Sequence, residues 1–222
     1  MAEMVEDGMC LGIGTGSTAA YAIEAIGRRV AAGGIRVVGV PTSYSADRLA
    51  REHGIPLTTL DDVQRIDLAF DGADEVDPQF NLIKGRGAAH TREKVVASEA
   101  DRFVILIDIT KRVEVLGTRM PVPVEVIPVA VAPVSRAIVR LGGDPSLRMG
   151  ANKDGPVVTD QGMWIIDAAF DGIPSPEALD RDLNQIPGVV GHGLFVGMAT
   201  DLLIGVSGEE VLHERAGQRA SR

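Results

Sequence analysis

A glycine-rich segment with hydroxyl side chains lies between an apolar run and a helical pattern near the N-terminus. Gly12-Ile13-Gly14-Thr15-Gly16-Ser17-Thr18 follows the apolar run that begins at Met9. A turn of this kind that opens a helix presents free N–H groups and the positive end of the helix dipole. Thr15, Ser17 and Thr18 add hydroxyl donors, and Gly16 lets the chain turn. The segment is expected to bind phosphate; the alternative is an ordinary strand-to-helix turn.

Two familiar nucleotide-binding motifs do not fit this segment. The dinucleotide fingerprint needs glycine where Ser17 stands, and an acidic residue at the end of the second strand, where the chain has Val40-Pro41-Thr42. The P-loop needs a Gly-Lys-Ser/Thr sequence, which is missing here. The sequence therefore favours a small phosphorylated ligand over a nucleotide.

Carboxylates follow the third apolar run of the chain. Asp71-Gly72-Ala73-Asp74-Glu75-Val76-Asp77 comes directly after Phe70. The carboxyl ends of the strands in an open α/β sheet form the ligand crevice, so Asp71 and Asp74 are expected to point into it. Two alternatives stay open at this point. The carboxylates could bind a metal, although their spacing fits no EF-hand loop, or the segment could be a solvated acidic loop.

A second glycine-rich segment combines a cation with backbone donors. Lys84-Gly85-Arg86-Gly87 lets an ammonium group and N–H groups converge on one small anion. Glu93 follows near a predicted helix N-terminus, where the helix dipole favours an ionised carboxylate. A lone charge on a helix is usually solvated, so Glu93 is a candidate functional residue only in combination with the lysine-glycine segment.

Composition narrows the class of protein. The 222 residues are 45% hydrophobic and 24% charged, which is typical of a globular chain. A net charge of −9 disfavours a general nucleic-acid surface, which needs a clustered basic face. Cys10 is the single cysteine, and the four histidines have no paired metal spacing, so no metal site is expected. No signal pattern or membrane-spanning run is found, and the expected location is the cytoplasm.

Apolar runs of strand length alternate with helical patterns through the first half of the chain. Continuous apolarity in the strands predicts a parallel sheet covered on both faces, as in an α/β fold. The predicted strands are 9–13, 35–40, 66–70 and 102–107, and the predicted helices are 18–32, 43–52 and 91–100.

The second half predicts a β-α-β-β-α-β order, which is that of a ferredoxin-like module. Thr159-Asp160-Gln161-Gly162 indicates a hairpin turn, and Ser175-Pro176 indicates a helix start. The strands are predicted at 121–127, 157–158, 163–169 and 189–196, and the first helix at 131–141. Residues 201–206 are predicted to return to the first sheet as its last strand, and the polar residues 208–222 to fray.

Taken together, the segments resemble the type A ribose-5-phosphate isomerases, in the same order and across nearly the whole chain. The matching stretches are Gly12 to Ala19, Asp71 to Glu75, Lys84 to Lys94, Asp108 to Lys111, Pro121 to Pro128 and Ile186 to Val190. The resemblance implies a Rossmann-like parallel-sheet domain, residues 1–120 with 198–222, and an inserted ferredoxin-like α/β domain, residues 121–197. It also implies a homodimer that interconverts D-ribose 5-phosphate and D-ribulose 5-phosphate in the pentose phosphate pathway, without a cofactor.

The resemblance also implies roles for individual residues. Glu93 is expected to be the proton acceptor, and Lys111 a further binding residue. Thr15, Gly16, Ser17 and Thr18 are expected to bind mainly the phosphate. Asp71, Gly72, Ala73 and Asp74, together with Lys84, Gly85, Arg86 and Gly87, are expected to line the sugar site. Lys84 could stabilise a developing oxyanion, and either Asp71 or Asp74 could assist ring opening or proton exchange between oxygens.

The sequence departs from the family pattern at two points. Only about ten residues precede Gly12, where the family usually has a longer segment with a helix, and Arg86 stands where glycine is common. Two other functions are considered beside the isomerase. One is a sugar-phosphate-sensing domain of a regulator, which the lack of a basic helix-turn-helix segment disfavours, and the other is a sugar-phosphate deaminase.

Overall fold

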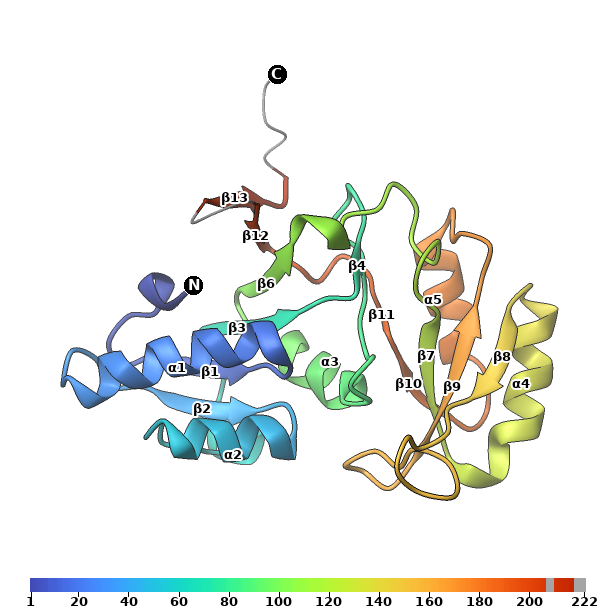
Figure 1. The fold of residues 1–222 in the computed structure, drawn as a ribbon, viewed down its shortest axis with the longest axis horizontal. Coiled ribbons are helices and arrows are strands. Elements are labelled where there is room, and N and C mark those ends of the chain that lie inside the picture. Colours follow the sequence, from blue (N-terminus) through green and yellow to red (C-terminus); the bar gives the residue numbers. More distant parts are fainter. Residues whose placement is uncertain (207–209, 218–222) are drawn as a thin grey trace. The chain divides into compact units, whose positions relative to one another are not determined.

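A six-stranded sheet organises the N-terminal part of the chain in the computed structural model, which describes residues 1–206 and 210–217. Five neighbouring strands are parallel, and the sixth is an antiparallel edge strand. In spatial order the strands are β13 (Val211–Arg215), β12 (Asp201–Gly205), β6 (Phe103–Asp108), β3 (Leu68–Gly72), β1 (Cys10–Ile13) and β2 (Val38–Pro41). The predicted parallel α/β sheet is confirmed. The strands of this sheet can be followed in Figure 1.

Helices cover this sheet because their apolar residues recur at helical spacing. In α1 (Ser17–Ala31) the buried residues include Ala19, Ala22, Ile23 and Ile26, which form one face of the helix. That face packs on the same core as Leu11 and Ile13 of β1, Leu68 of β3 and Val104 of β6. α2 (Tyr44–Glu52) begins where predicted, with the side chain of Ser43 accepting a hydrogen bond from the N–H of Ala46 at 3.0 Å.

Two buried ionisable side chains of this sheet, Cys10 and Asp201, have shifted pKa values. Burial, and then the negative charge of Asp67, raise the pKa of the Cys10 thiol, so the cysteine behaves as an apolar strand residue, as expected. Burial alone would also raise the pKa of Asp201. Hydrogen bonds from Arg102, His213 and Thr200 outweigh that effect and bring the pKa of Asp201 below its ordinary value.

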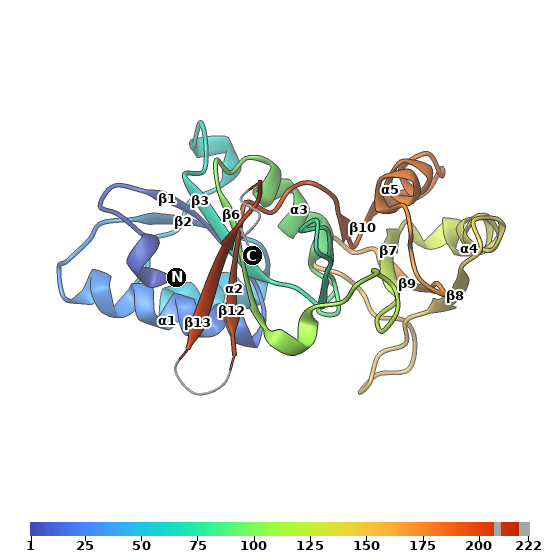
Figure 2. The ribbon, with the colours of Figure 1, turned by 90° about the horizontal axis from the view of Figure 1, so that it is seen from above.

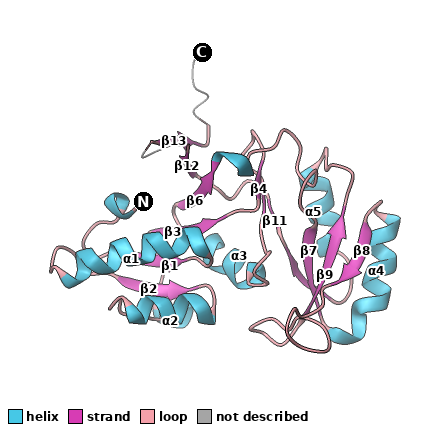
Figure 3. Cartoon of the chain, viewed as in Figure 1, coloured by secondary structure: helices cyan, strands magenta, loops and turns pink. Residues whose placement is uncertain are grey.

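A four-stranded antiparallel sheet with two helices forms the ferredoxin-like module. Its strands run in the order β10 (Val189–His192), β7 (Val122–Val126), β9 (Trp164–Ala169) and β8 (Asp144–Leu147). Val122, Val124 and Val126 alternate along β7 and pack in one core with residues of α4 (Val131–Arg140) and α5 (Pro176–Asn184). Figure 3 shows both helices in cyan beside these strands. The predicted β-α-β-β-α-β order is confirmed.

A small three-stranded sheet carries two of the segments predicted to do chemistry. It consists of β11 (Leu194–Phe195), β5 (Leu82–Ile83) and β4 (Glu75–Val76). β4 and β5 are antiparallel with Glu75 opposite Ile83, so Asp74 and Lys84 lie at the same end of the pair. The N–H of Asp74 donates to the Ile83 carbonyl at 2.8 Å, which holds the acidic segment against the lysine-glycine segment.

Three predicted strands differ from the observed ones. β9 pairs with β7 and β8, whereas Val158 forms only an isolated bridge with Trp164, although the predicted turn at Thr159 does form. The run at 189–196 is two strands in two sheets, because it breaks at Gly193. A Cβ at that position would lie 2.0 Å from the Lys84 carbonyl oxygen. The second strand begins at Val38 instead of residue 35.

The polar end of the chain was predicted to fray, and this prediction is wrong for residues 211–215. They form β13, which pairs antiparallel with β12, and Figure 2 shows the two strands side by side. Residues 207–209 and 218–222 lie outside the described part of the chain.

The chain divides into two compact units. One comprises Met1–Gly72, Arg92–Thr110 and Met198–Arg222, and the other comprises Ala73–Thr91 and Lys111–Gly197. α3 (His90–Ser98) contributes residues to both units. The predicted domains, 1–120 with 198–222 and 121–197, remain a proposal. The compact units differ from them in that residues 73–91 and 111–120 group with the second unit.

Candidate active site

The turn between β1 and α1 is built for close approach to the end of β3. A Cβ on Gly14 would lie 2.3 Å from the Phe70 carbonyl oxygen and 2.6 Å from Cγ of Asp71, so only glycine fits. Gly16 is the N-cap of α1 with a φ of 101°, and the first turn of α1 carries no acidic residue. No carboxylate in the first turn of α1 would therefore repel an anion at the N–H groups that open this helix.

Thr15 holds this turn in place. Its N–H donates to Oδ1 of Asp71 at 3.0 Å. Its hydroxyl lies 2.9 Å from the Thr42 hydroxyl and 2.7 Å from the Ser43 hydroxyl, within hydrogen-bond distance of both. Thr15 thus ties the first βα turn to β3 and to the second βα turn, while Ser17 and Thr18 are the exposed hydroxyls of the segment.

A pocket of about 270 Å³ lies at this turn, within one unit of the protein. Its polar lining comes from the turn and from Ser45 of α2, its apolar lining from α1 and α2, and no carboxylate lines it. The lining residues are Gly14, Thr15, Gly16, Ser17, Ala20, Ile23, Ser45, Ala46 and Leu49. Two helix N-termini and hydroxyl groups, in a lining without carboxylates, suit a phosphate dianion.

Thr42, Ser43 and Ser45 also lie at this turn, and they were not predicted from the sequence as site residues. A signal for them is visible in the sequence, since Pro41-Thr42-Ser43-Tyr44-Ser45 is a hydroxyl-rich segment after the strand next to β1. The carboxyl ends of neighbouring parallel strands meet at one sheet edge.

The acidic segment after β3 is not a solvated loop, so that alternative is wrong. Asp71, Glu75 and Asp77 are 2%, 1% and 5% exposed. Oδ1 of Asp71 accepts hydrogen bonds from the N–H groups of Thr15 and Gly72, so this carboxylate positions the β1–α1 turn.

The carboxylates of Glu75 and Asp77 hold loops in place through hydrogen bonds. Glu75 accepts hydrogen bonds from three backbone N–H groups: Gly117 at 2.6 Å, Arg119 at 2.7 Å and Met120 at 2.7 Å. Asp77 uses both carboxylate oxygens within its own turn, on the backbone and side chain of Asn81 and on the N–H of Gln79. Asp74 is partly exposed, in contrast to the buried carboxylates of Asp71, Glu75 and Asp77.

The segment Lys84–Gly87 is held by its neighbours in the second unit. Lys84 is 3% exposed, its N–H donates to the Gly193 carbonyl at 2.8 Å, and its Nζ lies 5.4 Å from the centre of the Phe195 ring. Gly85 has a φ of 107°, and a Cβ there would lie 2.6 Å from Nδ1 of His90, so the position requires glycine. The N–H of Arg86 donates to Oδ2 of Asp74 at 3.1 Å, and the side chain of Arg86 is exposed.

Glu93 lies in the first turn of α3 and is 6% exposed, in the unit that also contains the β1–α1 turn. A solvated helix residue would be far more exposed, so that reading of Glu93 is wrong. Lys111 ends a short 3-10 helix, Ile109–Lys111, and is half-buried. The first unit thus brings together Thr15–Thr18, Asp71, Gly72 and Glu93, and the second unit carries the remaining predicted residues.

Two negative findings apply to residues 1–206 and 210–217. No three side chains of His, Cys, Asp or Glu are grouped so that they could hold a metal ion. None of the helices there combines the length and apolarity of a bilayer-spanning segment.

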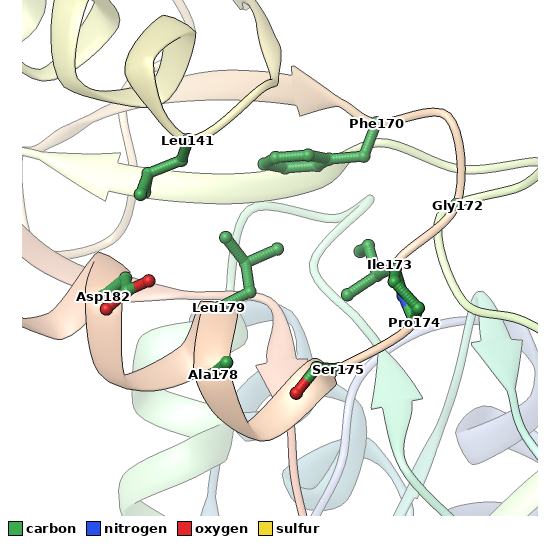
Figure 4. Close-up of a pocket in the computed structure, with 9 residues that line it drawn as sticks. All are labelled: Leu141, Phe170, Gly172, Ile173, Pro174, Ser175, Ala178, Leu179 and Asp182. Atoms are coloured by element: carbon green, nitrogen blue, oxygen red, sulfur yellow. The ribbon is translucent and has the colours of Figure 1, made fainter.

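A second pocket, of about 200 Å³, lies in the other unit between the end of α4, the end of β9 and the start of α5 (Figure 4). Its lining is mostly apolar, from Leu141, Phe170, Ile173 and Leu179, with Asp182 as its single charged residue. It contains none of the residues predicted to act on a sugar phosphate, so it is not the candidate active site.

The fold and the site define an α/β protein with a glycine- and hydroxyl-rich turn after its first strand and a buried carboxylate in the first turn of α3. Residues 38–209 match the family model described as ribose 5-phosphate isomerase A (phosphoriboisomerase A). The chain belongs to this family and is an isomerase. Neither a regulator nor a deaminase is supported by these comparisons.

Individual relatives agree with the family match. The chain is 56% identical to the ribose-5-phosphate isomerase A of Thermosynechococcus vestitus, over 96% of this chain and 92% of that protein. It is 57% identical to that of Haloarcula marismortui, over 93% and 88%. A solved D-ribose-5-phosphate isomerase in complex with phospho-erythronic acid superimposes with a TM-score of 0.94, at 48% identity, over 96% of this chain and 93% of that one. The ribose 5-phosphate isomerase A of Methanocaldococcus jannaschii gives 0.92, at 44% identity, over 96% and 94%.

Proposed function

We propose that this isomerase interconverts D-ribose 5-phosphate and D-ribulose 5-phosphate, with Glu93 as the base that moves a proton between C2 and C1. The family match supports the reaction. The observation that carries the site is the combination, within one unit, of a carboxylate-free hydroxyl pocket and the buried Glu93. An aldose-ketose shift passes through an enediolate, and one carboxylate can remove the proton at C2 and return it at C1.

The phosphate is proposed to bind in the pocket at the β1–α1 turn. Ser17 and Thr18 and the N–H groups that open α1 would hold the dianion, and Thr15 would fix the turn through its contacts with Asp71, Thr42 and Ser43. Binding the unreactive end of the substrate in this way positions the reacting carbons and contributes to the chemical step.

Lys84, Asp74 and the segment up to Gly87 are proposed to act on the sugar end, with Lys111 as a further binding residue. A buried ammonium group stabilises an oxyanion more strongly than a solvated one does. Asp74 is favoured over Asp71 for ring opening and for proton exchange between the oxygens, because Asp71 is engaged in holding the phosphate turn. Gly72 and Ala73 would place the two aspartates.

Phospho-erythronic acid supports this arrangement, since one relative was solved in complex with it. The compound carries a phosphate at one end and a carboxylate at the other. We propose that it binds this chain with the phosphate at the turn and with the carboxylate, which resembles an anionic enediolate, near Lys84. We also propose that the protein is a homodimer in the cytoplasm and needs no cofactor. Light scattering of the purified protein at assay concentration would test the dimer.

The test is a kinetic comparison of the wild type with Glu93→Gln. Ketose formation from D-ribose 5-phosphate is followed in both proteins, and the affinity for phospho-erythronate is measured separately. Glu99→Gln is the matched control, because Glu99 is an exposed residue just beyond the same helix. We expect a folded Glu93→Gln protein that binds phospho-erythronate but has lost turnover, and a control like the wild type. Near-normal turnover in Glu93→Gln would exclude Glu93 as the base.

A further inference from the structure

Arg148 reaches from the four-stranded sheet to the loop Lys84–Gly87. It follows β8, and its side chain is only 17% exposed. Its Nη1 donates to two consecutive carbonyl oxygens of the loop, those of Gly85 and Arg86, each at 3.0 Å. All of these residues belong to the same unit.

Asp167 of β9 holds the guanidinium group from the other side. Nε of Arg148 donates to Oδ2 of Asp167 at 2.8 Å, and Nη2 donates to Oδ1, which is the two-bonded geometry in which arginine and carboxylate pair most strongly. The backbone of Arg148 is fixed as well, since its N–H donates to the Ile165 carbonyl at 2.8 Å. Nε and Nη2 of the guanidinium group are therefore held by Asp167, and Nη1 donates to the loop.

This contact fixes the direction of the Arg86–Gly87 peptide group, whereas the Gly85 carbonyl is also held by the N–H of Ala88 at 3.0 Å. The C=O and N–H of a trans peptide are antiparallel, and no cis peptide occurs among the described residues. Because Arg148 binds the carbonyls of Gly85 and Arg86, the N–H groups of Arg86 and Gly87 point away from it. The N–H of Arg86 donates to Oδ2 of Asp74 at 3.1 Å.

We infer that Arg148 is a positioning residue of the isomerase, which keeps the N–H of Gly87 directed at the sugar so that it donates to the oxygen that becomes negative in the enediolate. The inference rests on the proposed function, which places the sugar beside Asp74 and Lys84. A segment with glycine at positions 85 and 87 has little conformational preference of its own. A flipped peptide would present the Arg86 carbonyl, an acceptor, to the developing negative charge.

The test is Arg148→Met, which keeps the volume of the side chain and removes all five donors. We expect kcat to fall on the order of 10–100-fold, less than the ~10²–10³ that outright loss of an oxyanion donor costs. The affinity for phospho-erythronate should fall by a similar factor. Inhibition by inorganic phosphate should be unchanged, because the phosphate pocket lies in the other unit. The pH dependence of kcat/KM should keep its shape, since Arg148 does not touch the base.

Two further variants complete the experiment. Arg148→Lys should restore part of the lost kcat, because an ammonium group can reach a carbonyl but cannot form the fork with Asp167 at the same time. Arg140→Met, an exposed arginine of α4 in the same unit, is the control and should match the wild type.

The outcomes separate the inference from the proposed function. A wild-type protein without isomerase activity refutes the function. An active wild type together with a folded Arg148→Met protein of normal kcat and normal phospho-erythronate affinity overturns the positioning role alone. Equal loss of inorganic phosphate and phospho-erythronate binding also overturns it, because that pattern indicates a general structural role. If Arg148→Met does not fold, Arg148→Lys takes its place, with an expected loss of about 3–10-fold in kcat, and a normal kcat in that variant overturns the inference.

Discussion

Replacing Glu75 by Gln should destabilise the protein although it changes only one atom of the side chain. The carboxylate is 1% exposed and accepts three short hydrogen bonds, from the N–H groups of Gly117, Arg119 and Met120. An amide offers one acceptor oxygen. If that oxygen stays near Arg119 and Met120, the amide NH₂ group faces the N–H of Gly117, so that two donors meet.

The expected loss follows from these three bonds. A hydrogen bond to a charged group contributes about 1.5–3 kcal/mol and a neutral one about 0.5–1.5 kcal/mol. Two bonds that become neutral therefore lose about 1 kcal/mol each, and the buried N–H of Gly117 loses its partner at a cost of about 1–3 kcal/mol. The free energy of unfolding should fall by about 4 kcal/mol in total. With an m-value of about 2–3 kcal/mol/M, the urea midpoint shifts down by roughly 1.3–2 M.

Urea unfolding followed by tryptophan fluorescence measures this shift. Trp164 is the only tryptophan and lies on β9, in the same unit as Glu75, so its signal reports on the part of the fold that the substitution affects. Glu114→Gln is the matched control, because Glu114 is exposed in that unit and surface changes of this kind stay within about 0.5 kcal/mol. A Glu75→Gln midpoint equal to that of the control would refute the assignment of Glu75 as the anchor of the loop at Gly117.

Four other predictions concern the site and the sheet. Glu93→Gln should lower kcat by at least ~10²-fold with the urea midpoint little changed, the opposite pattern to Glu75→Gln; unchanged kcat would contradict it. Replacing both Ser17 and Thr18 by Ala should weaken turnover of ribose 5-phosphate while the poor reaction of free ribose stays nearly the same, and equal loss of both reactions would show that the turn is only structural. Activity should survive exhaustive dialysis against a chelator, and loss that added Mg²⁺ or Zn²⁺ reverses would disprove this. Asp201→Asn should lower the free energy of unfolding by about 2 kcal/mol near pH 7. Because folding lowers the pKa of Asp201, its contribution is present above the unfolded value of about 3.9 and is lost as the pH falls through the folded value. The difference in urea midpoint between the wild type and Asp201→Asn should therefore disappear in acid, and a difference that stays constant with pH would exclude the linkage.

The order of helices and strands could be predicted from the sequence because it depends on local patterns. Continuous apolar runs identified the buried parallel strands, and the helical pattern predicted at 43–52 identified α2. The positive φ of Gly16 in the first turn and the position of the chemistry-bearing segments after the apolar runs are likewise local properties. The family resemblance, which rests on ordered motifs, was confirmed by the comparisons. The individual roles of the site residues stay a prediction.

Strand pairing and the function of each buried carboxylate were decided only by the tertiary structure. Trp164 begins β9, which pairs along its length with β7 and β8, and the predicted partner near Val158 makes a single bridge. β8 contacts α4, so its place in the sheet depends on the packing of that helix. The four acidic residues from Asp71 to Asp77 look alike in the sequence, yet the partners of Glu75 lie 42 to 45 residues away. The support that Arg148 gives the loop at Gly85 spans 63 residues. Contacts of that length follow from folding the whole chain around its cores, and no local pattern of residues encodes them.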